Sequence, residues 1–303
     1  MKKALLAYNP VSGSRFVPSH LDVIVQKFQE MGVLLTTYRI PETDQHLRDI
    51  LKMEYDFIIG AGGDGTLSQI VQLMLEEKIA LPFFAIGAGT CNNFTRNIDV
   101  SSQINSENQI CQIIESVYGG NLKRIDVGKV NDKSIFLTSL AGGSFADTSF
   151  STDKNLKLVM GPLAYYLKPL TEIANIKPYR VNIEADGKQY DENIYMFLLL
   201  NGKSVGNFTN FIEIADLSDG LMELVLIKES NTLEIANLFL SVIKEEDITI
   251  HNNVEVIRGN KFKITTPEDM PISIDGEKGP DGLLEVEVLR EVIEVFVSSE
   301  FEK

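Results

Sequence analysis

Up to about residue 90, the chain alternates between short apolar runs and stretches whose apolar residues recur with helical spacing. The apolar runs predict strands at Lys3–Tyr8, Val33–Arg39, Tyr55–Gly60 and Leu81–Ile86. The intervening stretches predict helices at Pro18–Met31, Asp44–Met53 and Thr66–Glu77. Such alternation is typical of a mainly parallel sheet covered by helices. We therefore expect an α/β domain over residues 1–125.

After about Arg124, strand patterns dominate and turn signals such as Asp186-Gly187 and Gly259-Asn260 separate them. The expected strands are Ile125–Val130, Ile135–Leu140, Tyr179–Ala185, Asn193–Asn201, Leu221–Lys228, Asn253–Arg258, Lys261–Thr266, Ile272–Ile274, Leu284–Leu289 and Val292–Val297. The expected helices are Leu156–Ala174, which is more typical of a core helix than of a groove for acyl chains, and Thr232–Lys244. This pattern predicts a second, antiparallel, sandwich-like β-rich domain over residues 126–303. It leaves open whether the last strands pack back toward the first domain.

The composition, with 44% hydrophobic and 23% charged residues, is ordinary for a folded protein. The net charge of −15 argues against attraction to nucleic acid or to an anionic membrane by the overall field. Cys91 and Cys111 indicate neither a disulfide framework nor a metal cluster. The N-terminal apolar run is too short for a signal peptide. A cytoplasmic protein without a nucleic-acid partner is the simplest expectation.

The segment Gly60-Ala61-Gly62-Gly63-Asp64-Gly65 fits the pattern G-x-G-x-x-G between a strand and a helix. That pattern alone would suggest a dinucleotide-binding turn, and a purely structural turn is the other alternative. The segment follows the third strand instead of the first, and Asp64 would repel a pyrophosphate unless a divalent cation lay between them. With Mg²⁺, the glycine amides, the helix dipole and Asp64 together predict a metal–phosphate site.

Two further loops follow strands of the same predicted sheet. Asn9-Pro10-Val11-Ser12-Gly13 follows the first strand, and Gly87–Phe94 follows the fourth. Each loop alone would be weak evidence, because these residues are ordinary turn formers. Ligands of open parallel sheets bind beyond the carboxyl ends of strands, so the three loops are expected to converge. Neither a P-loop nor the protein-kinase signatures occur in the sequence.

With these loops assembled, the chain resembles the diacylglycerol-kinase-like lipid kinases. Asn9–Gly13 matches the family pattern N-P-x-S-G, Gly62–Thr66 matches G-G-D-G-T, and Gly89–Arg96 matches G-T-x-N-D-F-x-R with one departure. In the second half, Arg124–Val130 looks like an opening strand, Gly161–Leu167 is similar to G-x-L-A-Y-Y, and Asp275-Gly276-Glu277 is similar to D-G-E. The resemblance implies a first domain like that of NAD kinases and phosphofructokinases.

The resemblance also implies roles for particular residues. Those expected to hold ATP are Asn9, Pro10, Val11, Ser12, Gly13, Gly62, Gly63, Asp64, Gly65, Thr66, Leu67, Ser68 and Thr90. Asp64 would organise the catalytic Mg²⁺, and Glu277 would be the general base for the lipid hydroxyl. Without the family, Asp275-Gly276-Glu277 would be only a turn between strands. Asn92, Asn93 and Arg96 are candidates for contacting phosphate or substrate, although a surface role for Arg96 is equally compatible with the sequence.

Two features of the resemblance concern metals. Soluble bacterial diacylglycerol kinases bind a structural Mg²⁺ in a turn that Asp216–Leu221 matches here. The resemblance implies that Asp219 would supply the carboxylate ligand and that the carbonyls of Asp216 and Leu221 would be further ligands. An Asp-Gly turn without metal is the alternative. The departure is Asn93, where the diacylglycerol kinases usually have Asp, and it removes a negative charge near the catalytic metal.

The sequence therefore predicts an ATP- and Mg²⁺-dependent lipid kinase, with diacylglycerol as the expected acceptor and phosphatidic acid as the product. The alternatives are an NAD kinase or other small-molecule kinase and, because of Asn93, a nucleotide- or lipid-binding homologue without catalysis. The expected partners are ATP and a lipid at the membrane surface, which the protein would reach transiently from the cytoplasm. A homodimer is compatible with the sequence.

Overall fold

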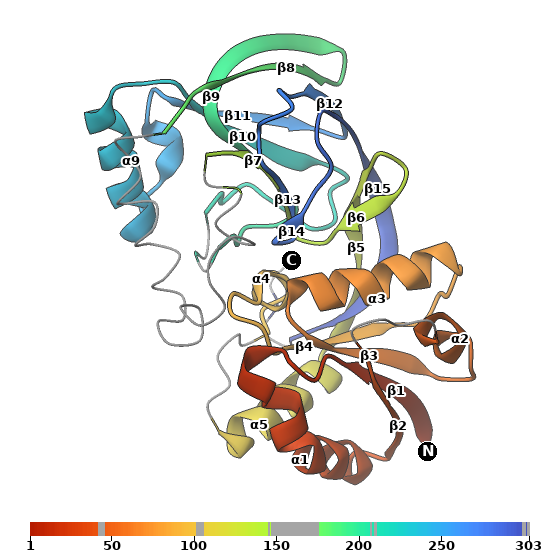
Figure 1. Cartoon of the computed structure of the whole chain (residues 1–303). Coiled ribbons are helices and arrows are strands. Elements are labelled where there is room, and N and C mark those ends of the chain that lie inside the picture. Colours follow the sequence, from red (N-terminus) through yellow and green to blue (C-terminus); the bar gives the residue numbers. More distant parts are fainter. Residues whose placement is uncertain are drawn as a thin grey trace. The chain divides into compact units, whose positions relative to one another are not determined.

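The chain folds into two compact units, one formed by Met1–Ile125 with Glu291–Lys303 and the other by Asp126–Arg290 (Figure 1). A computed structural model describes residues 1–41, 46–100, 106–144, 146, 176–206, 208, 211–298 and 301. Two strands, β5 (Asn121–Val130) and β15 (Leu283–Val297), run from one unit into the other.

The first unit contains a parallel sheet. Its strands are β1 (Lys2–Tyr8), β2 (Val33–Arg39), β3 (Phe57–Gly62), β4 (Phe83–Gly87) and the end of β15. β1 lies between β2 and β3, and β4 lies between β3 and Val295 of β15, all in parallel pairs. Because the strands are parallel, β1, β3 and β4 end at the same edge of the sheet.

Helices cover both faces of this sheet (Figure 1). They are α1 (Phe16–Glu30), α2 (Leu47–Leu51), α3 (Asp64–Glu76), α4 (Asn93–Asn97) and α5 (Glu107–Tyr118), with a 3₁₀ turn at Gly13–Arg15. α1 packs against α5 on one face, and α3 packs against β3 and β4 on the other. The three strand ends are therefore held between two layers of helix.

An aromatic cluster forms part of the core of the first unit. Phe28 of α1 meets Phe84 of β4 edge-on with ring centroids 5.5 Å apart. Phe296 of β15 lies 5.3 Å from Phe57 and is stacked on Tyr118 at 6.0 Å. Burial of one such ring contributes about 2 kcal/mol to stability. The cluster fixes the C-terminal end of β15 in the first unit.

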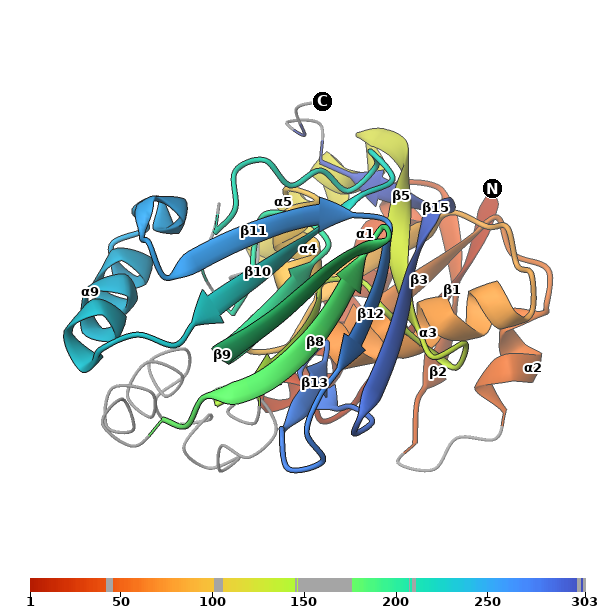
Figure 2. The same ribbon diagram turned by 90° about the horizontal axis from the view of Figure 1, so that it is seen from above.

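The second unit is built from antiparallel strands. They are parts of β5 and β15 together with β6 (Ser134–Phe136), β7 (Ser139–Gly143), β8 (Tyr179–Ala185), β9 (Lys188–Leu200), β10 (Met222–Lys228), β11 (Val254–Gly259), β12 (Lys261–Thr265), β13 (Ile272–Ile274) and β14 (Glu277–Lys278). The strand order runs β14-β13-β7-β9-β8-β12-β15, and β9 also pairs with β10, which pairs with β11. Figure 2 shows β8 to β12 side by side.

From Ile194 to Leu200, strand β9 is largely buried on both faces, which explains the apolar run of this half of the strand. Phe197 and Leu199 face a core that includes residues of β12 and β15. Leu198 and Leu200 face a second core that includes Leu238 of α9 (Thr232–Ile243). A 3₁₀ turn at Ile248–Ile250 follows α9. The fold predicted from the sequence, an α/β domain followed by an antiparallel sandwich-like domain, is confirmed.

Two predicted strand boundaries are wrong. The predicted strand Ile135–Leu140 is divided between β6 and β7, because the backbone amides at Leu137 and Thr138 donate to the Asp275 carboxylate. The two strands predicted within 284–297 form the single strand β15, which contains Glu291 at φ 49°. The predicted helix Asp44–Met53 begins outside the described residues. Within residues 46–53 the structure contains the shorter helix α2, Leu47–Leu51.

Helices α4 and α5 were not predicted, although α5 carries a clear signal. Its buried residues Ile110, Ile113, Ile114 and Val117 recur with helical spacing. The Ser106 side chain caps the helix by accepting a hydrogen bond from the Gln109 amide at 3.3 Å. The predicted helix Leu156–Ala174, with the motif Gly161–Leu167, lies outside the described residues. Among the described helices, none has the length and apolar character needed to span a membrane.

Candidate active site

The loops after β1 and β4 meet in the first unit. Gly13 has φ +50°, and a Cβ atom there would lie 2.1 Å from the Ala88 carbonyl oxygen. Only glycine therefore permits this approach of the two backbones. The predicted convergence of the loop Asn9–Gly13 on the loop Gly87–Phe94 is present in the structure.

The loop after β3 joins the same group. Gly63 is the N-cap residue of α3, and a Cβ atom on Gly89 would lie 2.6 Å from the Gly63 Cα. The amide of Ala88 also donates to the Gly62 carbonyl at 2.7 Å. Helix α3 begins at Asp64, two residues before the predicted start, so the first amides of the helix belong to Asp64 and Gly65. The next amide, that of Thr66, already donates to the Gly63 carbonyl at 2.9 Å. Amides in a first helical turn, together with the helix dipole, favour phosphate oxygens.

Asn9 connects the first loop to α3. Its side-chain amide donates to Thr66 Oγ1 at 3.1 Å, and its Oδ1 accepts from the Val11 amide at 3.0 Å. Its own backbone amide donates to the Ala61 carbonyl at 2.9 Å. Val11 (66% exposed) and Thr90 remain accessible at the ends of their loops, whereas Thr66, Leu67 and Ser68 are buried in α3. Asn9 thus orients the loop that the sequence assigns to ATP.

Asp64 binds the start of α4. Its Oδ2 accepts from the Asn93 amide at 3.1 Å and its Oδ1 accepts from the Phe94 amide at 2.9 Å. A carboxylate at the first amides of a helix is favoured by hydrogen bonding and by the helix dipole. Asp64 therefore holds the loop after β3, Gly62–Thr66, against the loop after β4, Gly89–Asn93. The sequence did not reveal this role. Asp64 is also a hard oxygen donor at the loop ends, which is the chemistry that Mg²⁺ prefers.

Asn92 shapes the third loop. It adopts a left-handed conformation at φ 54°, and its side chain binds both the amide and the carbonyl of Gly89, at 2.6 and 3.2 Å. Its carbonyl accepts from Thr95 Oγ1 at 3.1 Å. The Arg96 Nε donates to the Cys91 carbonyl at 3.0 Å. These contacts explain how a short helix such as α4 is held in place.

Asp275-Gly276-Glu277 lies in the second unit as the hairpin between β13 and β14. Asp275 at φ 45° and Gly276 at φ 85° form a two-residue turn of the type that favours Asp-Gly. Asp275 is buried, and its carboxylate accepts from the amides of Leu137, Thr138 and Ser139 at 2.7 to 2.9 Å. Glu277 is exposed at the start of β14. Asp275 thus anchors the hairpin, and Glu277 projects from it.

Replacement of Asp275 by alanine is expected to destabilise the second unit by about 3 kcal/mol, because three backbone amides lose their acceptor. Urea unfolding followed by far-ultraviolet circular dichroism measures the effect. Asp281→Ala is the matched control, since Asp281 is an exposed residue of the following turn. Equal stability of the two variants would contradict the anchoring role.

The turn Asp216–Leu221 also belongs to the second unit. The Asp216 Oδ1 accepts from the Ser218 amide at 2.8 Å, and the Asp219 Oδ1 accepts from the Leu221 amide at 2.9 Å. The Gly220 amide donates to the buried Asp126 carboxylate at 2.6 Å. The turn is therefore stabilised by carboxylates that bind backbone amides.

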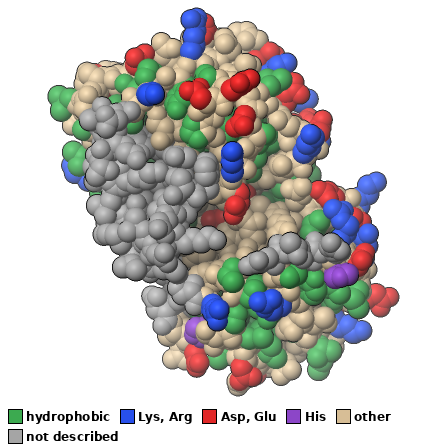
Figure 3. Space-filling view, viewed as in Figure 1, with side chains coloured by type: hydrophobic (Ala, Val, Ile, Leu, Met, Phe, Trp, Pro, Cys, Tyr) green, Lys and Arg blue, Asp and Glu red, His purple; other side chains and the backbone are tan. Residues whose placement is uncertain are grey.

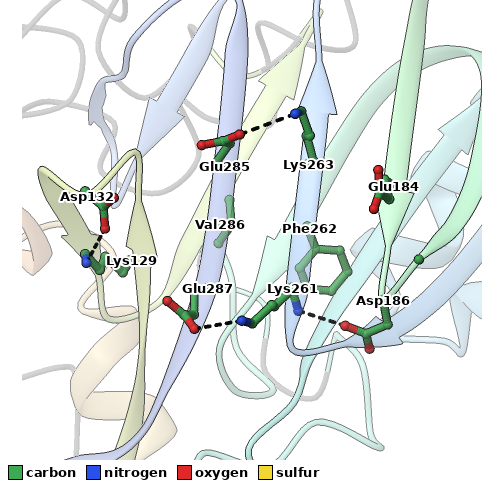
Figure 4. Close-up of a pocket in the computed structure, with 11 residues that line it drawn as sticks. Lys129, Asp132, Glu184, Asp186, Lys261, Phe262, Lys263, Glu285, Val286 and Glu287 are labelled. Carbon is green, nitrogen blue, oxygen red and sulfur yellow. Dashed lines mark hydrogen bonds and ion pairs between the residues drawn. The ribbon is translucent and has the colours of Figure 1, made fainter.

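A shallow groove of about 410 Å³ lies on the second unit and contains none of the predicted site residues (Figure 4). It is lined mainly by residues of β5, β8, β12 and β15. Lys261 faces Glu287 at 3.2 Å, and Lys263 faces Glu285 at 3.4 Å across the β12–β15 pair. Because each lysine is paired with a carboxylate, the groove offers no concentrated charge for a phosphate. On the face shown in Figure 3, acidic and basic described side chains are likewise interspersed.

Comparisons with known proteins agree with this arrangement. A diacylglycerol kinase catalytic domain matches residues 3–130, and a YegS C-terminal NAD kinase beta sandwich-like domain matches residues 141–297. A diacylglycerol kinase of Bacillus subtilis (strain 168) is 29% identical over 92% of this chain and 91% of that protein. A diacylglycerol kinase of Staphylococcus saprophyticus is 28% identical over 99% of this chain and 96% of that protein.

Solved structures show the same fold. A crystal structure from Bacillus anthracis str. Sterne superposes with a TM-score of 0.80 at 22% identity, covering 99% of this chain and 97% of that one. A second structure, of a diacylglycerol kinase from the same strain, gives a TM-score of 0.75 at 19% identity, covering 99% and 98%. The chain belongs to the diacylglycerol-kinase-like family of lipid kinases. It is a phosphotransferase with an alcohol group as acceptor, and membership of this family implies ATP, a divalent metal and a lipid substrate.

Proposed function

We propose that this protein transfers the γ-phosphate of ATP to the free hydroxyl of diacylglycerol, giving phosphatidic acid, with Mg²⁺ as the metal. The observation that carries the proposal is the convergence of three loops, Asn9–Gly13, Gly62–Thr66 and Gly89–Asn93, at the ends of β1, β3 and β4. The relatives from Bacillus subtilis and Staphylococcus saprophyticus support the choice of lipid.

The proposal assigns the nucleotide to the first unit. The amides that begin α3 would bind phosphate oxygens, and Asn9, Pro10, Val11, Ser12, Gly13 and Thr90 would contact the rest of ATP. Asp64 would hold Mg²⁺, which neutralises phosphate charge when bound. Because Asp64 also binds the amides of Asn93 and Phe94, the metal ligand would be oriented by the third loop. Arg96 and Asn93 are proposed to lie near the transferred phosphate.

The proposal assigns proton removal to Glu277 in the second unit. A general base must be accessible to the hydroxyl that it deprotonates, and Glu277 is exposed on a hairpin fixed by Asp275. The two acidic residues of Asp275-Gly276-Glu277 thus have different tasks. Asp275 holds the turn, and Glu277 would accept the proton.

The test is a phosphate-transfer assay with radiolabelled ATP and MgCl₂. The acceptors are detergent-dispersed diacylglycerol, sphingosine, ceramide and, as a soluble acceptor, NAD. We expect label in phosphatidic acid. Transfer to NAD in place of the lipids would refute the proposed acceptor, and the absence of transfer to any of the four would refute the proposed diacylglycerol kinase activity.

Replacement of Asn93 by aspartate is expected to raise the turnover number at limiting Mg²⁺ by about tenfold, which corresponds to about 1.4 kcal/mol. A second carboxylate close to Asp64 attracts the divalent ion, and the Asn93 amide that binds Asp64 is unchanged by the substitution. Magnesium titrations of activity measure the effect. Asn97→Asp, which adds the same charge at the end of α4, serves as the control. An unchanged magnesium dependence would show that the site has adapted to Asn93.

A further inference from the structure

Arg258 lies opposite Glu223 in the antiparallel pair of β10 and β11. Its Nε donates to Glu223 Oε1 at 2.8 Å, and its terminal nitrogen forms an ion pair with the Asp219 carboxylate. The Glu223 side chain is 1% exposed, whereas Asp219 and Arg258 are 28% and 38% exposed. One guanidinium therefore bridges a buried carboxylate in a strand and a half-buried carboxylate in the preceding turn.

This part of the second unit has an excess of negative charge. Asp216 and Asp219 lie in the turn Asp216–Leu221, and Asp126 and Glu223 lie next to it. Burial raises the pKa of Glu223, and its hydrogen bond to Arg258 opposes that shift. Burial of carboxylates near one another is unfavourable unless a cation accompanies them. Arg258 supplies a cation to Asp219 and Glu223, and its planar fork matches two carboxylates at once. Arg290 also lies against the turn, since a Cβ atom on Gly220 would be 3.4 Å from the Arg290 Nε.

A divalent cation on Asp219 would lie beside the guanidinium of Arg258, and the two positive charges would repel each other. The Asp219 Oδ1 is also hydrogen-bonded to the Leu221 amide. Among the described residues, no group of three or more His, Cys, Asp or Glu side chains is arranged to hold a metal ion. The expected site has a single carboxylate ligand, Asp219, and both of its oxygens are already bound, one by Arg258 and one by the Leu221 amide. The side chains present at this turn therefore do not fit the structural Mg²⁺ that the sequence suggested for Asp216, Asp219 and Leu221.

We propose that Arg258 replaces a structural divalent cation in this protein, by bridging Asp219 and Glu223 and holding the turn Asp216–Leu221 against β10. The competing arrangement is the expected one, a metal on Asp219 and the carbonyls of Asp216 and Leu221. Glu223 Oε2 is a buried atom that has no hydrogen-bond partner among the described residues, so the Glu223 carboxylate depends on Arg258. The two arrangements differ in what keeps the turn folded. The inference concerns stability and is independent of the proposed reaction.

The test measures the thermal unfolding temperature of the full chain without nucleotide, in EDTA and in MgCl₂ at matched ionic strength. For each protein, the unfolding temperature in EDTA is subtracted from that in MgCl₂. The measured quantity is the part of this Mg²⁺-dependent shift that disappears when Asp219 is replaced by Asn. We expect this shift to be zero in the wild-type protein, because Arg258 already occupies the site. In Arg258→Gln we expect the unfolding temperature in EDTA to fall by about 5 °C, and Mg²⁺ to recover part of the loss through Asp219.

Arg180→Gln is the matched control. Arg180 pairs with Asp191 in the same unit, but both side chains are exposed, so loss of the same charge should change the unfolding temperature little. The double variant Arg258→Gln with Glu223→Gln should unfold at a higher temperature than Arg258→Gln alone, because no unpaired buried charge remains.

Two results would overturn the inference. One is a Mg²⁺-dependent rise in the wild-type unfolding temperature that Asp219→Asn abolishes. The other is an Arg258→Gln variant that matches Arg180→Gln in EDTA. If Arg258→Gln does not fold, the comparison of wild type with Asp219→Asn still decides between the guanidinium and the metal.

Discussion

Asp64→Ala is expected to lower the turnover number by about a thousandfold or more. The substitution removes the proposed metal ligand and also the acceptor for the amides of Asn93 and Phe94. Radiolabelled phosphate transfer to diacylglycerol measures the loss. Asp22→Ala, which removes an exposed carboxylate of α1 in the same unit, controls for the change in charge.

The two roles of Asp64 can be separated with Asp64→Asn. Asparagine keeps a side-chain carbonyl that can accept one of the two amide hydrogen bonds, but it lacks the charge that attracts Mg²⁺. If the metal role dominates, Asp64→Asn should be nearly as inactive as Asp64→Ala. The hydrogen-exchange rates of the Asn93 and Phe94 amides in Asp64→Asn should nevertheless stay closer to those of the wild type than in Asp64→Ala. Substantial activity in Asp64→Asn would contradict a metal role and leave the structural one.

Glu277→Ala is expected to lower the turnover number by about a hundredfold to ten-thousandfold, the usual range for loss of a general base. The ATP concentration for half-maximal rate should change little, because the proposal assigns ATP to the first unit. The fold should be intact, since Glu277 is exposed and Asp275 still anchors the hairpin. Steady-state kinetics over a range of pH gives both parameters.

The matched control for Glu277→Ala is Glu268→Ala, which makes the same change at an exposed position just before β13. Restored activity of Glu277→Ala with small carboxylate ions in solution would support the role in proton transfer, because such ions can replace a missing base. Normal turnover in Glu277→Ala would refute that role.

The three loops of the first unit could be predicted because glycine-rich and Asn-Pro turns directly follow apolar runs. Contacts between distant residues could not. The Asp64 carboxylate is held by α4, whose five residues are too few to show a helical period. Asp275 interrupts the predicted strand Ile135–Leu140 by accepting from the Leu137 amide, which lies 138 residues earlier in the chain. The residues around Leu137 carry no turn signal that would indicate this break. In contrast, the buried residues of α5 recur with a helical period that is visible in the sequence.

Arg258 and Glu223 show the same limit in the second unit. Each lies in a strand that the sequence identified, but only the register of β10 against β11 places them opposite each other. The motif at Asp216–Leu221 suggested a metal, whereas the side chains that surround the turn include an arginine from a strand far along the chain. A local motif therefore predicts a backbone turn more securely than it predicts what the turn binds.

The return of β15 to the first unit has a consequence for folding during synthesis. Val295 pairs with Phe83 of β4, and Phe296 lies in the aromatic cluster with Phe57 and Tyr118. The ribosome makes the whole of Asp126–Arg290 before these residues, which takes on the order of ten seconds. During that time the first unit has an uncovered sheet edge beside β4 and an incomplete core. The second unit can therefore complete its own fold first, and the first unit completes its sheet and its aromatic core only after residues 291–297 have left the ribosome.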